Sequence, residues 1–78
     1  MAEPAQIERV ITESLITFGA DADQINRDAE LEALDIDSLD LAELSQIIEE
    51  QFGVELTSTD VAEIRTVGDA IDLVAERA

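Results

Sequence analysis

Between Asp37 and Gly53 the apolar residues recur at helical spacing, and a helix gathers them on one face. Asp37 is a good N-cap with Asp40 three residues later, and Gly53 can take the left-handed conformation that ends a helix. The predicted core face consists of Leu41, Leu44, Ile48 and Phe52. The opposite face carries Leu39, Glu43, Gln46 and Glu50, so we expect Leu39 to point at water.

The chain before Asp37 predicts one helix and one long loop. Pro4 suits the first turn of a helix because it has no N–H to satisfy, and Gly19 suits its end. The apolar stripe of this helix is Ile7, Val10, Ile11, Leu15 and Phe18. Residues 20–36 have no sustained period and predict a loop, of a length that tends to be functional. Its apolar anchors are Ile25, Leu31, Leu34 and Ile36.

The chain after Gly53 predicts two more helices, of which the first is short. Residues 57–60 are a cluster of capping residues, and the short helix that they open carries Val61 and Ile64. Thr66 and Asp69 form a capping pair for the last helix. Its inward residues are Val67, Ile71 and Val74, with Arg77 near its C-terminal end. We therefore expect an all-α fold of four helices, three longer and the third short, with no segment left for a sheet.

Size and charge limit what such a bundle can be. The 78 residues support one domain, and we expect residues 1–78 to form it. A formal charge of −16 points away from nucleic acid and anionic lipid and toward basic partners. The hydrophobic fraction of 46% is enough for a small core. Since the chain has no secretory signal and no stretch long enough to insert into a membrane, we expect a soluble, cytoplasmic protein.

The side-chain inventory argues against catalysis by this chain. It contains no Cys, His, Lys or Tyr, the residues that supply most nucleophiles and general acids or bases alongside carboxylates. A carboxylate pair alone would need a cleft that a bundle of this size is poorly placed to supply. We therefore predict that the chain is not an enzyme and has no catalytic residues.

Twelve carboxylates and no cation lie between Asp28 and Glu63, which raises the possibility of a calcium loop. A loop that starts at Asp35 puts Leu39 at its fifth position and an acidic residue where glycine is required. A loop that starts at Asp21 fails at the same two positions, with Ile25 and then Asn26. We predict no metal site, although weak and diffuse cation binding stays open.

Residues 34–44, Leu-Asp-Ile-Asp-Ser-Leu-Asp-Leu-Ala-Glu-Leu, resemble the signature of acyl carrier proteins, in which the serine of an Asp-Ser-Leu triplet carries a phosphopantetheine arm. The resemblance extends over nearly the whole chain, including residues 49–56 and 65–71. It departs at Thr57, where the family often has Pro, and in the absence of Lys. It implies a right-turning four-helix bundle whose Ser38 is modified by a separate transferase that uses coenzyme A, and which then carries acyl groups as thioesters.

The same resemblance implies roles for other residues and for partners. The attachment site is Ser38 with its neighbours Asp37 and Leu39. The positions on the partner-recognition helix are Leu39, Asp40, Ala42, Glu43, Gln46, Glu49 and Glu50. The interior that shields an attached chain would be lined by Leu44, Ile48, Phe52, Leu56, Ile64, Ala70 and Ile71. The implied partners of this monomer are a phosphopantetheinyl transferase and basic-surfaced ketosynthase, acyltransferase, reductase and dehydratase enzymes.

The chemistry of position 38 agrees with that assignment, although position alone would make Ser38 an ordinary helix-start residue. A phosphodiester there would lie at a helix N-terminus, where free N–H groups and the helix dipole favour negative charge. These would partly offset repulsion from Asp37 and Asp40. No base in the chain can activate Ser38, so another protein must modify it.

These observations favour a freestanding carrier of a type II fatty-acid or polyketide synthase. One alternative is a specialised carrier of aryl, aminoacyl or peptidyl groups. Peptidyl carriers usually have Gly-Gly before the residue that precedes the serine, where this chain has Asp35-Ile36. An alternative of another class is an acidic interaction or cation-buffering domain.

The charge leads to a prediction about stability, because sixteen uncompensated negative charges surround a core with few large side chains. We expect salt to raise the unfolding temperature, with Mg²⁺ or Ca²⁺ effective at lower concentrations than Na⁺. Thermal melts followed by circular dichroism over a series of salt concentrations measure this effect. A melting temperature that responds to neither kind of ion would show that self-repulsion does not limit the fold.

Overall fold

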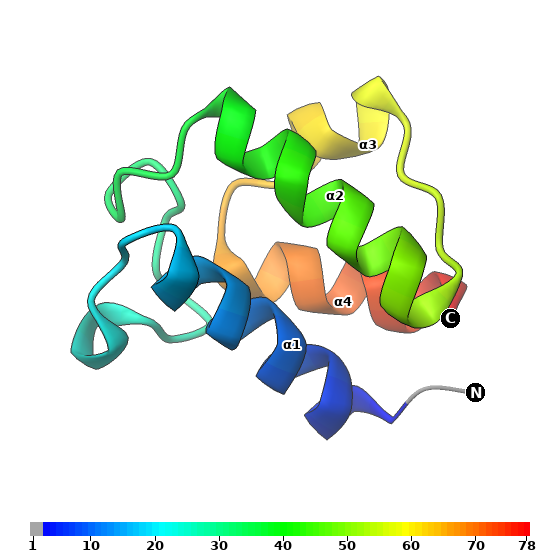
Figure 1. The fold of residues 1–78 in the computed structure, drawn as a ribbon, viewed down its shortest axis with the longest axis horizontal. Helices are drawn as coiled ribbons and strands as arrows, with labels where there is room; N and C mark the ends of the chain where they lie inside the picture. The colour runs from blue at the N-terminus through cyan, green and yellow to red at the C-terminus, as the bar shows by residue number, and fades with distance from the viewer. Residues whose placement is uncertain (1–2) are drawn as a thin grey trace.

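A computed structural model describes residues 3–78 and confirms the all-α fold (Figure 1). The elements are α1 (Pro4–Thr17), the 3-10 helix η1 (Ala22–Gln24), α2 (Ser38–Phe52), α3 (Ser58–Glu63) and α4 (Val67–Arg77). No strand forms within the described residues, which contain one isolated bridge between Glu30 and Thr66. As predicted, three helices are long and the third is short.

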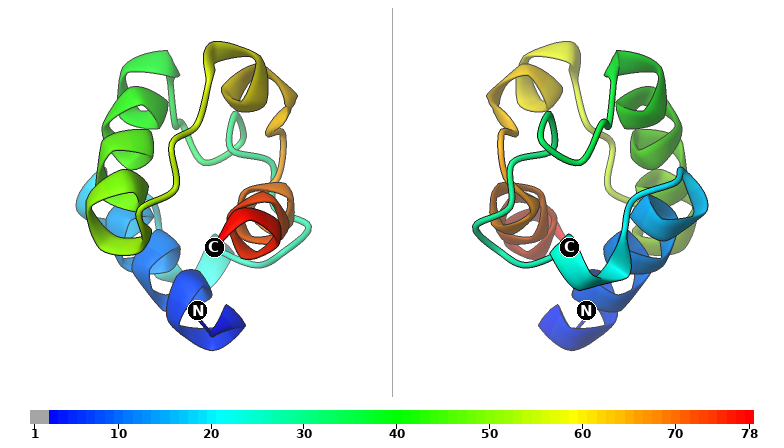
Figure 2. Two further views of the ribbon diagram at one scale, coloured as in Figure 1. Left: turned by 90° about the vertical axis from the view of Figure 1, so that its right-hand side faces the viewer. Right: turned by 90° about the vertical axis from the view of Figure 1, so that its left-hand side faces the viewer.

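The four helices surround a common interior. Seen end-on, α1, α2, α3 and α4 follow one another around the core (Figure 2). The loop between α1 and α2 covers one end of the bundle, and the start of α1 and the end of α4 lie toward the other (Figure 1).

Side-chain caps set where three of the helices begin. Asp37, Thr57 and Thr66 are the N-caps of α2, α3 and α4, and each forms a capping box with an aspartate three residues later. In the last of these, the Asp69 carboxylate accepts the N–H groups of Thr66 and Arg65 at 3.1 and 3.2 Å, and these bonds hold the pKa of Asp69 below its ordinary value. The capping pairs expected at Asp37 and Thr66 are therefore confirmed.

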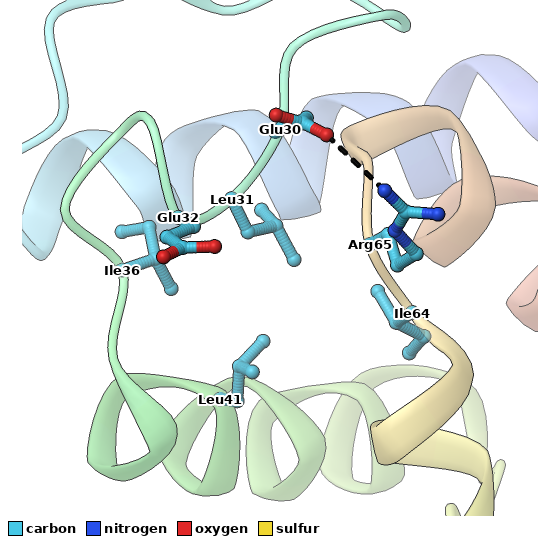
Figure 3. A pocket seen from close by; sticks show the side chains of 7 residues that line it. All are labelled: Glu30, Leu31, Glu32, Ile36, Leu41, Ile64 and Arg65. Carbon is cyan, nitrogen blue, oxygen red and sulfur yellow. Dashed lines mark hydrogen bonds and ion pairs between the residues drawn. The ribbon is translucent and has the colours of Figure 1, made fainter.

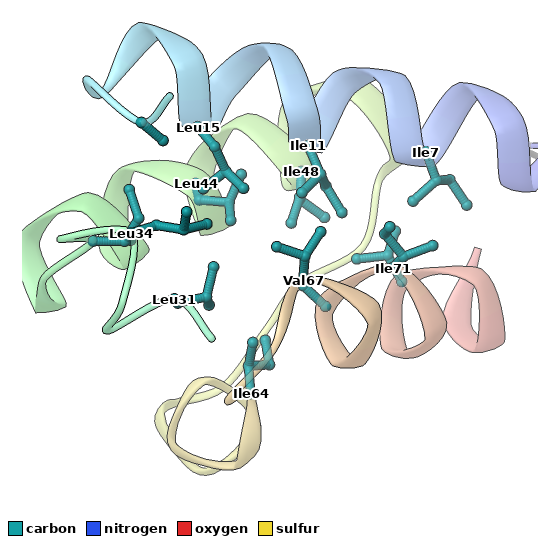
Figure 4. Close-up of a cluster of buried hydrophobic side chains, with 14 of the residues drawn as sticks. Ile7, Ile11, Leu15, Leu31, Leu34, Leu44, Ile48, Ile64, Val67 and Ile71 are labelled. Carbon is teal, nitrogen blue, oxygen red and sulfur yellow. The ribbon is translucent and has the colours of Figure 1, made fainter. Parts of the chain in front are cut away.

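The core is built from aliphatic side chains of every long helix and of the loop (Figure 4). From α1 it takes Ile7, Ile11 and Leu15, whereas Val10 and Phe18 of the predicted stripe are half-buried. From α2 it takes Leu44 and Ile48, with Leu41 and Phe52 packed half-buried at its edge. From α4 it takes Val67, Ala70, Ile71 and Val74. The predicted helical faces are therefore confirmed, with the α4 stripe fully buried and two residues in each of the α1 and α2 stripes only half-buried.

The loop of residues 20–36 docks on the start of α4. Its carbonyl oxygens at Arg27 and Ala29 accept the N–H groups of Gly68 and Val67 at 2.9 and 3.0 Å. These first-turn donors have no partner within their own helix, so the loop satisfies them. Of the four predicted anchors, Leu31, Leu34 and Ile36 are buried and Ile25 is half-buried. The sequence prediction of a loop without regular structure missed η1. This 3-10 helix begins where the Asp21 carboxylate accepts the N–H of Asp23.

Gly68 is the position where this docking leaves no room for a side chain. A Cβ at Gly68 would lie 2.9 Å from the carbonyl oxygen of Arg27, which is backbone and cannot move aside easily. We expect Gly68→Ala to destabilise the fold by about 1–3 kcal/mol through overpacking. Helix propensity alone predicts the opposite sign, a gain of up to ~1 kcal/mol.

Urea unfolding of Gly68→Ala measures the effect. Ala5→Gly is the matched control, because Ala5 is exposed at the same second position of α1 and reports the ordinary cost of glycine. A Gly68→Ala variant as stable as the parent would show that the Arg27 carbonyl leaves room for a methyl group at position 68.

Candidate functional site

Ser38 is the first residue of α2, and its side chain is exposed. The carboxylate of Asp37 accepts the N–H of Asp40 at 2.9 Å, and the carboxylate of Asp40 accepts the N–H of Asp37 at 3.4 Å. This reciprocal cap is complete without the Ser38 hydroxyl. The hydroxyl is therefore available for attachment at no cost to the helix start.

Asp35 sets the direction in which the backbone enters α2, a role that the sequence did not predict. Its φ of 60° is left-handed, and the turn around it is closed by the N–H of Ile36, which donates to Leu31 O at 3.0 Å. Aspartate tolerates this conformation better than most residues, which is the one signal that could have revealed it. The turn buries Ile36 and leaves Asp37 and Ser38 at the surface.

A groove of about 360 Å³ lies beside Ser38, between α2 and the start of α3. We call it the α2–α3 groove; its lining is Ser38, Ala42, Ser45, Leu56, Thr57, Ser58 and Val61. Ser45 donates its hydroxyl to Leu41 O at 3.0 Å, and the Thr57 hydroxyl accepts the Asp60 N–H at 3.1 Å. The lining therefore contains both hydroxyl groups and apolar side chains, which suits a ligand that has both amide groups and methylene groups.

A second cavity, of about 200 Å³, lies where the loop, α2 and the end of α3 meet (Figure 3). We call it the apolar pit; its floor consists of Leu31, Ile36, Leu41 and Ile64. Its rim carries Glu30, Glu32 and Arg65, and an Arg65 guanidinium nitrogen lies 3.5 Å from a Glu30 carboxylate oxygen. The pit therefore combines four aliphatic side chains with three charged ones.

The residues predicted to line an interior cavity do not meet in one cavity. Leu56 lines the α2–α3 groove and Ile64 lines the apolar pit. Phe52 is half-buried at the edge of the core. The other four are packed inside the core: Leu44, Ile48, Ala70 and Ile71. Sequence reasoning identified Leu31, Ile36 and Leu41 as apolar anchors or core residues, but nothing in their spacing indicated that a void lies between them.

The outer face of α2 brings the predicted recognition residues together. Leu39 is 71% exposed, as expected, and Glu43, Gln46 and Glu50 are exposed at helical spacing from it. Ala42 and Glu49 are also exposed, and Ala42 lines the α2–α3 groove. Asp40 is half-buried because its carboxylate is part of the cap. The face is therefore an apolar centre with an acidic rim.

Among residues 3–78, no group of three or more carboxylates has the geometry to hold a metal ion. In the same part of the chain, no helix has both the length and the apolar composition needed to cross a membrane.

Comparison with known proteins agrees with the geometry around Ser38. Residues 10–74 match the model of the family described as "Phosphopantetheine attachment site". The chain is 39% identical over 72 residues to an acyl carrier protein of Chlamydia caviae, which covers 91% of this chain and 90% of that protein. It is 37% identical over 78 residues to an acyl carrier protein of Solidesulfovibrio magneticus, which covers 99% and 96%.

An acyl carrier protein of Chlamydia felis is 41% identical over 61 residues, 77% of this chain and 78% of that protein. The chain therefore belongs to the phosphopantetheine-attachment family. It is a carrier whose prosthetic group is phosphopantetheine, which confirms the family resemblance of residues 34–44 and the cofactor that it implied.

Proposed function

We propose that Ser38 is the residue that carries the phosphopantetheine arm, and that residues 1–78 form one acyl carrier domain without catalytic activity of its own. The observation that carries this proposal is an exposed hydroxyl at the first position of α2, not needed for the cap and beside a groove. A phosphodiester at this position gains from the free N–H groups and the dipole of the helix start.

The transferase supplies the chemistry of loading in this proposal. The Ser38 oxygen forms a phosphodiester with the arm while the phosphoanhydride bond of coenzyme A breaks and the nucleotide bisphosphate leaves. The hydroxyl proton passes to a base of the transferase, because this chain has no His, Lys or Cys that could accept it. Ser38 contributes position, and Asp37 contributes the cap that keeps it there.

In this proposal the arm and its acyl group bind in the two cavities. The α2–α3 groove begins at Ser38 itself and suits the arm, whose amides can bond with its hydroxyl groups. The apolar pit suits the first methylenes of an acyl chain, each worth up to ~0.8 kcal/mol when buried. A chain that reached Leu44, Ile48, Ala70 or Ile71 would have to displace packed side chains, so the predicted interior lining requires the core to open.

The outer face of α2 is the proposed docking surface. An exposed apolar residue, Leu39, inside a rim with Glu43 and Glu50 suits brief contacts with basic enzymes, because acidic charge speeds association while a small apolar centre keeps it transient. The proposed partners are a phosphopantetheinyl transferase and the ketosynthase, acyltransferase, reductase and dehydratase enzymes of fatty-acid or polyketide synthesis, met by a cytoplasmic monomer.

Loading tests the attachment residue. We expect mass spectrometry of the parent protein, incubated with coenzyme A and a phosphopantetheinyl transferase, to show one added phosphopantetheine. Ser38→Ala is expected to show none while its circular dichroism spectrum stays that of the parent, since Asp37 is the cap. Thr59→Ala, which removes another exposed hydroxyl in a first helical turn, is the control and is expected to load fully. A loaded Ser38→Ala protein would refute the assignment.

Association kinetics test the docking surface separately. Glu43→Arg is expected to slow loading by roughly tenfold at low salt and by less at high salt, because charge at the rim acts mainly on the association rate. Glu8→Arg makes the same charge change on the exposed surface of α1 and controls for the altered net charge. If both variants load as fast as the parent at low salt, the outer face of α2 is only a solvated surface.

A further inference from the structure

Few side-chain contacts fix the position of the short helix α3. Four of its six residues are exposed, namely Ser58, Thr59, Ala62 and Glu63. A helix of this length is not stable by itself in water. Its position therefore depends on Val61, which is half-buried, on Asp60, which is buried, and on the chain at either end.

Asp60 is buried because an arginine from the far end of the chain reaches it. The Arg77 guanidinium donates two hydrogen bonds to the Asp60 carboxylate, at 2.5 and 2.6 Å, one to each oxygen. The same carboxylate accepts the N–H of Thr57 at 2.9 Å. Together these bonds hold the pKa of Asp60 well below its ordinary range, with the bond from Arg77 the largest cause, so the carboxylate is ionised near neutral pH.

The ion pair differs from the other three in the described chain. The side chains of Asp60 and Arg77 are 10% and 40% exposed. In the pairs of Arg9, Arg27 and Arg65, every side chain is at least 52% exposed. Water and salt screen the attraction within an exposed ion pair strongly. They screen the attraction within a partly buried, bidentate pair much less. Of these four pairs, the one between Asp60 and Arg77 is also the one that reaches α3.

The place of α3 decides the shape of the α2–α3 groove. Thr57, Ser58 and Val61 form one wall of that groove, and Ser38 belongs to the opposite wall. Asp60 lies between these residues in sequence, and its carboxylate binds both Thr57 and the last turn of α4. A change at Arg77 therefore acts on the groove wall without touching Ser38 or the outer face of α2.

We propose that Arg77 is a positioning residue that, through Asp60, holds α3 in place and thereby maintains the α3 wall of the α2–α3 groove, against which the arm lies. Loss of the ion pair frees α3 to move away from α2, and the arm and its cargo then become more accessible to solvent. The part of this inference that concerns the arm rests on the proposed attachment at Ser38, whereas the part that concerns α3 does not.

Hydrogen exchange of the unloaded protein tests the hold on α3. We expect Arg77→Gln to speed exchange of the amides of residues 57–64 by about tenfold, with a smaller change in α1 and in the middle of α2. Arg77→Lys keeps the charge but not the two-pronged geometry, so its exchange rates are expected to lie between those of the parent and Arg77→Gln. Arg9→Gln removes an exposed pair of α1 and is expected to leave residues 57–64 unchanged.

The double variant Asp60→Asn/Arg77→Gln shows whether the two residues act as a unit. Its exchange rates in residues 57–64 are expected to match those of the more affected single variant, since each substitution removes the same contact. Additive effects, equal acceleration over the whole chain, or no acceleration would each overturn the proposal.

A polarity-sensitive fluorophore on the terminal thiol of the loaded arm tests the groove. Its emission is expected to shift to the red in Arg77→Gln and to stay that of the parent in Arg9→Gln. An unshifted spectrum together with accelerated exchange in residues 57–64 would refute the effect on the groove. A parent protein that cannot be loaded would refute the proposed attachment, and the exchange result would then stand by itself.

Discussion

The docking of the loop between α1 and α2 onto the first turn of α4 is the contact on which the rest of the structure depends. Two loop carbonyls accept the N–H groups of Val67 and Gly68, and Gly68 allows this approach because it has no side chain. The docked loop brings Leu31, Leu34 and Ile36 into the core. Asp35 turns the chain in a left-handed conformation, Ile36 returns it to the core, and α2 begins two residues later, so the start of α2 depends on the contact between this loop and the last helix of the chain.

The few cations are used where they stabilise the fold and are absent where partners are proposed to dock. Arg27 pairs with Asp72, Arg65 with Glu30 and Arg77 with Asp60, so three of the four arginines join segments distant in sequence. None of these pairs involves the outer face of α2, whose carboxylates stay uncompensated. This distribution leaves the outer face of α2 with a negative field that suits basic partners.

A similar division of roles operates within the first turn of α2. Asp37 and Asp40 cap the helix, Leu39 is presented to solvent, and Ser38 lies between them with its hydroxyl unused by the cap. Attachment, recognition and stability thus depend on different side chains of adjacent residues. The groove that begins at Ser38 adds a fourth requirement, a wall from α3, and that wall is held from the C-terminal turn of α4.

The sequence by itself determined the helices, their caps, the anchors of the loop, the exposure of Leu39 and the family. These features are local, because helical periodicity and capping depend on residues within one or two turns, and the motif around Ser38 is contiguous. Only the tertiary structure decided the two cavities, the left-handed turn at Asp35, the close approach at Gly68 and the pairing of Asp60 with Arg77. Apolar spacing predicted that Leu41 and Leu44 face inward. Whether an inward side chain borders a void or fills the core depends on neighbours from other helices, which no local pattern records.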